Sequence, residues 1–314
     1  MHHDPRTRPN LFLVGAQKCG TTSMYEYLRC HPQIYFPVAR EVTEENGHLY
    51  MRTKEPHHFC PDLHYDDRLR IEDRNEYLDL YRDGAGARWC GDATPHYLCS
   101  EVAPGMVRQF CPDARILIML RPPVEMMRSS HNDFLRNRWE DIEDFHAAVD
   151  VWEDRREGRR IPPRCGCPEL LDYLSLARFA PQVERWIAAF GAHAVKVILL
   201  EDMVNAPETT FREILRFLEV NTAFRLDFRI YNEAPSSSRS ESLLRSIYQA
   251  HWVNRIARAA VPYRIRRAAL AAARGRRARR YPAHDPRDEP LRALCRPDVG
   301  RLATLIGRDL SHWV

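Results

Sequence analysis

Short apolar runs alternate with amphipathic stretches along most of this chain. The apolar runs at residues 11–14, 34–36, 88–91, 115–120 and 195–200 predict strands. The last two runs are mostly apolar along their whole length. That composition is typical of central strands in a parallel sheet, because such strands are buried on both faces.

Between these runs, apolar residues recur with helical periodicity. The predicted helices cover residues 74–81, 102–110, 124–136, 170–190 and 207–218. Strands that alternate with helices predict an α/β fold. We therefore expect a three-layer α/β/α, P-loop-like architecture around a central, mostly parallel sheet.

The alternation ends at a polar loop, 236–240. We predict one domain over residues 9–245 and a helical, arginine-rich extension over 246–314, without a core of its own. Residues 255–280 contain ten arginines and no acidic residue. Two interpretations remain open for this stretch: a basic amphipathic helix in weak contact with an anionic membrane surface, or a solvated helix face.

Composition narrows the class of protein. The chain has 314 residues, 44% of them hydrophobic, and a formal net charge of only +4, which gives no general case for nucleic-acid binding. No apolar run reaches the ~18 residues that a transmembrane helix needs, and residues 1–10 are too polar for a signal peptide. With nine scattered cysteines, we expect a cytoplasmic protein with free thiols. Composition says nothing about the oligomeric state.

The most informative segment joins the first strand to the first helix. Gly15 and Gly20 bracket a turn that contains Lys18, and hydroxyl residues open the helix at Thr21. The first N–H groups of a helix have no intrahelical partner and favour an anion, so this turn predicts a phosphate cradle. Only three of the 47 basic residues are lysine, which makes Lys18 conspicuous.

The two glycines have the spacing of a nucleotide-triphosphate P-loop, but Thr21 stands where that motif requires lysine. After the strand at 115–120, Arg121 stands where a Mg²⁺ site would want a carboxylate. Cys165 and Cys167 have no second ligand pair at metal-site spacing. We therefore expect an anionic ligand held by lysine, arginine and hydroxyls, and no metal.

Three motifs, in order, resemble those of sulfotransferases that use 3′-phosphoadenosine 5′-phosphosulfate (PAPS). Residues 15–28, GAQKCGTTSMYEYL, resemble the 5′-phosphosulfate loop of that family. Arg121 and Ser129 match its 3′-phosphate signature, and residues 54–59, KEPHHF, match its acceptor-side motif. The resemblance covers about residues 10–245 and is closest to soluble bacterial members, which are related to heparan sulfate sulfotransferase domains.

This resemblance implies roles for particular residues. Arg121 and Ser129 would grip the 3′-phosphate, and Arg239 would close over the nucleotide. Glu55 would be the general base and His57 would assist it, while Lys18 neutralises the leaving phosphate. The 5′-phosphosulfate would lie on the loop residues Gln17, Lys18, Cys19, Gly20, Thr21, Thr22 and Ser23.

Two departures from the family pattern leave alternatives open. By distance from the preceding motif, Glu41 falls where the family's glutamate usually stands, whereas local context favours Glu55. Ala93 stands where polysaccharide-sulfating relatives often carry lysine. The acceptor, whether small molecule, glycan or lipid, cannot be identified from the sequence.

The sequence thus predicts a sulfotransferase that moves the sulfuryl group of PAPS to a hydroxyl, or second to an amine, and releases adenosine 3′,5′-bisphosphate (PAP). The alternatives are a P-loop kinase or NTPase and a non-catalytic nucleotide-binding protein.

Overall fold

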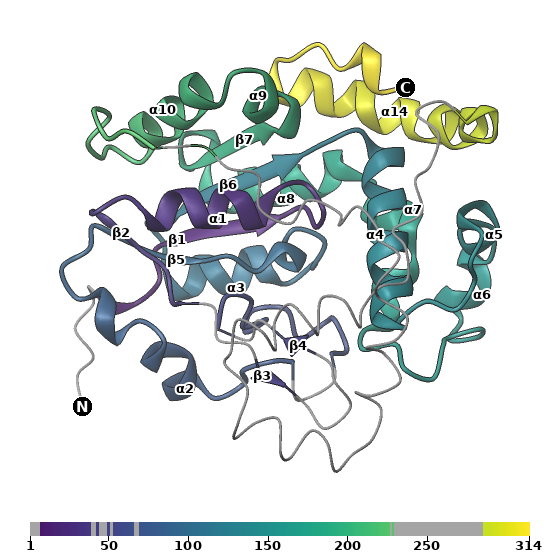
Figure 1. Ribbon diagram of the computed structural model, residues 1–314, viewed down its shortest axis with the longest axis horizontal. Helices are drawn as coiled ribbons and strands as arrows, with labels where there is room; N and C mark the ends of the chain where they lie inside the picture. The colour runs from purple at the N-terminus through teal and green to yellow at the C-terminus, as the bar shows by residue number, and fades with distance from the viewer. Residues whose placement is uncertain are drawn as a thin grey trace, which may run out of the picture.

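Five parallel strands form the centre of the molecule in the order β2-β5-β1-β6-β7. The computed structural model describes residues 7–38, 42–43, 49–50, 53–65, 69–226, 228 and 285–314. Helices lie on both sides of the sheet (Figure 1), so the three-layer α/β/α prediction is confirmed. The strands are β1 (Leu11–Gly15), β2 (Ile34–Tyr35), β5 (Trp89–Asp92), β6 (Arg115–Leu120) and β7 (Val195–Leu199).

The helices follow the strands in the alternating order that the sequence predicts. A separate two-stranded antiparallel sheet joins β3 (Val42–Thr43) to β4 (Leu49–Tyr50). A short 3₁₀ turn, η3 (Pro95–Tyr97), follows β5. The α-helices are α1 (Thr21–Arg29), α2 (Arg74–Asp79), α3 (Ala103–Phe110), α4 (Pro123–Asn137), α5 (Phe145–Asp150), α6 (Trp152–Arg156), α7 (Tyr173–Leu176), α8 (Phe179–Phe190), α9 (Leu200–Asn205), α10 (Pro207–Phe217) and α14 (Glu289–Ile306).

The sheet is buried on both faces where its strands are central. All five residues of β1 are buried, and so are all residues of β6 except Arg115. Strands β5 and β6 pair with the two edges of β1, and helices lie on both sides of the sheet, so every side chain along β1 enters the core. The carboxyl ends of β1, β5 and β6 therefore meet at one edge of a rigid sheet.

One predicted helix is wrong as a continuous element. Residues 170–171 end a 3₁₀ turn, and the rest of the stretch forms the short helix α7 and the longer α8. Ala177 and Arg178 separate the two helices, with Arg178 at φ −81° and ψ 77°. Pro181 explains the break, because its ring would clash with the carbonyl of residue 177 in a continuous helix. In the observed structure Pro181 lies in the first turn of α8, where no backbone donor is needed.

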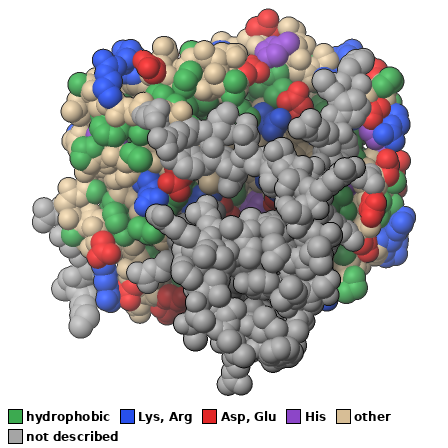
Figure 2. All heavy atoms as spheres, viewed as in Figure 1, with side chains coloured by type: hydrophobic (Ala, Val, Ile, Leu, Met, Phe, Trp, Pro, Cys, Tyr) green, Lys and Arg blue, Asp and Glu red, His purple; other side chains and the backbone are tan. Residues whose placement is uncertain are grey.

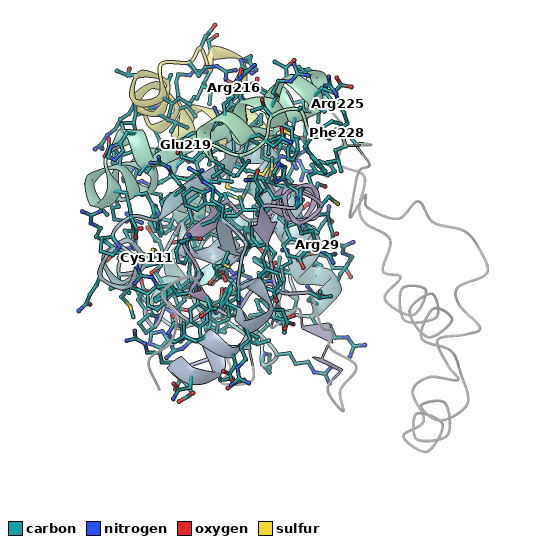
Figure 3. All side chains as sticks on the ribbon, turned by 90° about the vertical axis from the view of Figure 1, so that its left-hand side faces the viewer. Arg29, Cys111, Arg216, Glu219, Arg225 and Phe228 are labelled. Carbon is teal, nitrogen blue, oxygen red and sulfur yellow. The ribbon has the colours of Figure 1, made fainter. Side chains whose placement is uncertain are left out.

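The C-terminal helix packs on the main domain. Helix α14 lies against α8, and its apolar face of Leu291, Cys295, Val299 and Leu302 joins the same hydrophobic core as β1. The predicted domain boundary at 245/246 and the arginine-rich stretch 255–280 lie outside the described residues, and the domain assignment stays a prediction. Figure 3 shows Arg225 and Phe228 together at one edge of the molecule; the Phe228 ring packs against Tyr27 of α1.

A buried ionic cluster also ties the C-terminal segment to α4. The guanidinium of Arg128 lies 2.5 Å from Asp288 and 3.3 Å from Asp285, and all three side chains are less than a tenth exposed. His146 lies 3.1 Å from Asp288. His146, Asp285 and Asp288 could in principle hold a metal ion, but the Arg128 cation already lies against both carboxylates. The cluster is therefore an ion-pair network.

None of the helices in the described part of the chain has the length and apolar composition needed to span a bilayer.

Candidate functional site

Two glycines shape the loop between β1 and α1. Gly20 is the N-cap of α1 in the left-handed region, with φ 89°, a conformation that strains residues with a Cβ. At Gly15, a Cβ would lie 2.6 Å from the backbone oxygen of Pro95, so glycine lets the end of β1 approach η3. The Cys19 N–H donates to Ala16 O inside the turn at 3.2 Å. The amides at the start of α1, from Gly20 onward, are thus the ones positioned for an anion.

Lys18 extends from this loop toward α4. Its ammonium lies 3.2 Å from Asp133, and both side chains are a little over a quarter exposed. Asp133 is also paired with Arg136 at 2.6 Å. Burial alone would raise the pKa of Asp133, but the charges of Lys18 and Arg136 outweigh it and lower that pKa. Lys18 therefore carries its charge at the mouth of the loop, beside a carboxylate that is itself ionised.

Arg121 joins the end of β6 to the same loop. Its Nη1 donates to the carbonyl oxygen of Lys18 at 3.3 Å, and its Nη2 lies 3.2 Å from Glu125. Its Nε is buried and has no partner among the described residues. Ser129 lies two turns into the following helix, half-buried. The two cations that the sequence singles out, Lys18 and Arg121, are thus adjacent at the carboxyl edge of the sheet.

The acceptor-side segment docks against α1. The Lys54 ammonium is fully buried, lies 5.7 Å from the Tyr25 ring of α1 and is bonded to the Glu55 carboxylate. The Glu55 side chain is 25% exposed. Lys54 therefore fixes the backbone beside Glu55, while Glu55 keeps contact with solvent. A partly exposed carboxylate on a rigid segment can accept a proton from a substrate.

A buried aromatic wall continues from this segment. His57, with φ 53°, stacks on Tyr65 at 4.2 Å between ring centroids and on His96 at 5.5 Å. His96 contacts the Tyr65 hydroxyl through Nδ1 and lies 2.8 Å from Gln17 Oε1 through Nε2. The wall therefore reaches from the acceptor-side segment to the glycine loop.

Burial keeps both histidines of the wall neutral. It lowers the pKa of His96 to about 4, with Glu55 and Asp133 opposing the shift and Lys54 adding to it. Burial also lowers the pKa of His57 well below its ordinary value. The charges of Glu55 and Lys54, from the acceptor-side segment, and of Asp133, beside Lys18, all act on His96. The acceptor-side segment and the glycine loop are therefore close enough to interact electrostatically.

Asp92 accepts the hydrogen bonds that hold the residues after β5 in place. This buried carboxylate at the end of β5 accepts hydrogen bonds from Thr94, Tyr77 and Tyr97 at 2.7 to 3.0 Å. Burial raises its pKa to about 6, even though those hydrogen bonds lower it. Its donors hold the chain around η3, and so hold His96, in place.

The predicted site residues mostly come together. Figure 2 shows basic, acidic and histidine side chains near the centre of one face. Two predicted residues, Glu41 and Arg239, lie outside the described residues and stay predictions. Cys19 is fully buried, burial raises its thiol pKa to about 12, and its backbone N–H is already bonded to Ala16 O. Gln17, Lys18, Cys19 and Gly20 form the loop, Thr21, Thr22 and Ser23 open α1, and Glu55 and His57 lie in the acceptor-side segment. Arg121 follows β6 and contacts the loop, and Ser129 lies on α4.

Sequence reasoning missed three members of this site: Tyr65, His96 and Asp133. A signal existed for two of them. His96 follows a strand next to β1, and Asp133 lies four residues after Ser129 on the same helix, where side chains share a face. Tyr65 has no comparable signal, since it lies in a segment without regular structure.

Comparison with known proteins gives the family. The model of the sulfotransferase family matches residues 9–164. A crystal structure of a sulfotransferase from Alicyclobacillus acidocaldarius is 28% identical and superposes with a TM-score of 0.69, covering 98% of each chain. The chain belongs to the sulfotransferase family. This sulfotransferase shares with that bacterial structure the α/β architecture described above.

The curated relatives are longer proteins, and this chain matches only a part of each. This sulfotransferase is 22% identical to human carbohydrate sulfotransferase 15, over 76% of this chain and 48% of the relative. It is 26% identical to mouse bifunctional heparan sulfate N-deacetylase/N-sulfotransferase 1, over 68% of this chain and 22% of the relative. The chain thus spans about half the length of the first relative and less of the second.

Proposed function

We propose that the protein transfers the sulfuryl group of PAPS to a hydroxyl group and releases PAP. The proposal rests on one arrangement: Lys18 on a glycine-bracketed loop, Arg121 bonded to the backbone of that loop, and Glu55 beyond a wall that starts at Gln17. Two cations suit the two phosphates of PAPS, and a nearby carboxylate suits the acceptor.

The steps follow from the chemistry of in-line transfer. The acceptor oxygen attacks sulfur, and the bond between sulfur and the bridging phosphate oxygen breaks. Glu55 takes the acceptor's proton, and Lys18 with the amides of α1 neutralises the negative charge on the departing phosphate. Arg121 and Ser129 hold the 3′-phosphate, with Arg121 able to form a two-pronged contact.

The acceptor class to test first is a sugar hydroxyl. Named relatives of this chain are a carbohydrate sulfotransferase and a heparan sulfate N-sulfotransferase. The Glu55 side chain is 25% exposed, and this partial exposure suits an acceptor of either size, a small molecule or the end of a glycan.

A pair of lysine variants tests the role of the loop. Lys18→Ala should weaken PAP binding measured by calorimetry and should lower sulfuryl transfer from ³⁵S-labelled PAPS to a panel of sugar acceptors by about 10²–10³-fold. Lys196→Ala is the matched control, because Lys196 is similarly exposed but pairs with Glu213 on α10. An unchanged Kd for PAP in the Lys18 variant would contradict the proposal.

Glu55→Gln separates catalysis from binding. We expect PAP affinity to be retained and transfer to fall by about 10²–10⁴-fold, since the amide cannot take a proton. Full activity of this variant would move the base to Glu41 or His57. ATP turnover that depends on Mg²⁺ would favour a kinase instead, and PAP binding without any transfer would favour a non-catalytic binding protein.

A further inference from the structure

Gln17 has an unusual environment for a loop residue. Only 7% of the residue is exposed to solvent. Its Oε1 lies against His96, but its Nε2 is buried and has no hydrogen-bond partner among the described residues. A buried amide donor without a partner is costly, so it points to a ligand group.

The two neighbours Gln17 and Lys18 contact different sides of the site. Lys18 reaches Asp133 on α4, whereas Gln17 reaches His96 in η3. His96 in turn stacks on His57, two residues from Glu55, and the Glu55 charge acts on it. The Gln17 carboxamide therefore lies between the loop that would hold the 5′-phosphate and the carboxylate that would face the acceptor.

The hydrogen-bond chain determines which end of the carboxamide faces the site. Burial raises the pKa of Tyr65 and lowers that of His96, so at neutral pH the phenol is protonated and the imidazole is neutral. A neutral imidazole donates from one nitrogen and accepts at the other. If the Tyr65 hydroxyl donates to Nδ1, then Nε2 carries the proton and donates to Gln17 Oε1, which leaves the NH₂ group facing the site.

The opposite polarity is unfavourable. It would turn Gln17 Oε1 toward the anion and would leave the Tyr65 hydroxyl proton in need of another acceptor. No other hydrogen bond of Tyr65 is present among the described residues apart from the one to His96 and its backbone bond to Leu63. The chain of three side chains thus favours a donor, not an acceptor, at this point.

We propose that Gln17 Nε2 donates a hydrogen bond to a non-bridging oxygen of the sulfuryl group in transit, and that Tyr65 and His96 are positioning residues that fix its orientation. This inference rests on the proposed function, because the sulfuryl group belongs to PAPS. It adds a neutral donor to the cationic Lys18, on the side of the sulfuryl group that faces the acceptor.

The test compares the binding of PAPS with that of PAP, which lacks the sulfuryl group. Because only binding is measured, the acceptor need not be known. Calorimetry would give the Kd of each nucleotide for the full-length wild type, Gln17→Met, His96→Leu, Tyr65→Phe and the Gln17→Met/His96→Leu double variant. We expect PAP affinity to stay within about twofold in all five proteins and PAPS affinity to fall by about tenfold in the Gln17 and His96 single variants. Tyr65→Phe, which keeps the ring, should shift PAPS affinity in the same direction.

The double variant distinguishes positioning from an independent contact. If His96 acts only through Gln17, the double variant should bind PAPS no more weakly than the weaker single variant. Unchanged PAPS-to-PAP affinity ratios, or an additive double variant, would overturn the inference while leaving the proposed function intact. A wild type that binds neither nucleotide would instead overturn the proposed function. PAP binding also reports that each variant is folded.

Discussion

At the residue scale, the site uses neutral buried side chains as well as charged ones. His57 and His96 are both buried, and burial lowers the pKa of each. Lys54 is buried too, but it is paired with Glu55. The aromatic wall of His57, Tyr65 and His96 can therefore pack tightly without burying an unpaired charge. Tight packing fixes the direction of each of its hydrogen bonds.

The lowered pKa of His96 predicts acid sensitivity. In the unfolded chain a histidine titrates near 6.5, whereas folded His96 titrates at about 4. The stabilisation is therefore complete above pH 6.5 and is lost as the pH falls toward 4, by about 3 kcal/mol from this residue. His96→Asn should accordingly lose less stability than wild type between pH 7 and pH 4.5.

Urea unfolding at several pH values would measure this difference. The raised pKa of Asp92, about 6, acts in the opposite direction, because its stabilisation is lost as the pH rises through that value. Asp92 is present in both proteins, so its contribution cancels in the comparison. Parallel pH profiles for wild type and His96→Asn would show that His96 is not kept neutral by the fold.

At the scale of elements, the junction between β1 and α1 controls the anion cradle. Gly20 gives α1 a left-handed N-cap, and the helix start lies directly after it. The loop backbone at Lys18 is also left-handed, with φ 61°. Such conformations cost about 1–3 kcal/mol for a residue with a side chain and are typical of functional loops.

Gly20→Ala should therefore affect both stability and binding. Alanine would have to adopt φ 89° at this position, and its Cβ would lie 2.7 Å from Leu200 Cδ1. We expect a loss of about 1–2 kcal/mol in the free energy of unfolding and weaker PAP binding by calorimetry. Gly105→Ala in α3 is the control, because a Cβ there meets nothing within 4 Å and alanine favours a helix. Equal behaviour of the two variants would contradict the role given to Gly20.

The same junction shows what a sequence can predict. Apolar runs located the five strands of the main sheet to within two residues, and the signal is clearest for β1 and β6, which are buried on both faces. The glycine spacing located the loop. The pairing of Lys18 with Asp133 and of Gln17 with His96 was not predictable, since 115 and 79 residues separate the partners and only the folded sheet brings them together. The break before Pro181 was visible in the sequence but was outweighed by the apolar periodicity around it.

At the scale of the whole molecule, residues 285–314 pack onto the helices around the central sheet. Helix α14 packs on α8 through its apolar face, and Asp285 and Asp288 bind Arg128 on α4. Arg128 immediately precedes Ser129, which is proposed to hold the 3′-phosphate. The C-terminal segment therefore supports the helix that carries part of the nucleotide site.

Arg128→Met should be strongly destabilising. It would leave the buried Asp288 carboxylate with His146 but without its arginine, and breaking a buried ion pair in this way typically costs about 3–5 kcal/mol. Asp285 would keep its pair with Arg287 at 3.0 Å. Arg301→Met is the control: Arg301 also links α14 to α8, through Glu184, but it is 60% exposed, and such surface pairs contribute about 0–1 kcal/mol. Thermal and urea unfolding of both variants would measure the difference, and similar losses would show that the Arg128 cluster is no more than a surface contact.

The position of Asp288 in the chain also bears on how the protein is made. Arg128 and Asp288 are 160 residues apart in sequence, so during synthesis α4 emerges from the ribosome long before its carboxylate partner exists. Until residues 285–288 have been synthesised, Arg128 has neither of these carboxylates to pair with. Helix α4 would then reach its packed arrangement only after residues 285–288 have emerged, so a nascent chain stalled before residue 285 should bind PAP poorly.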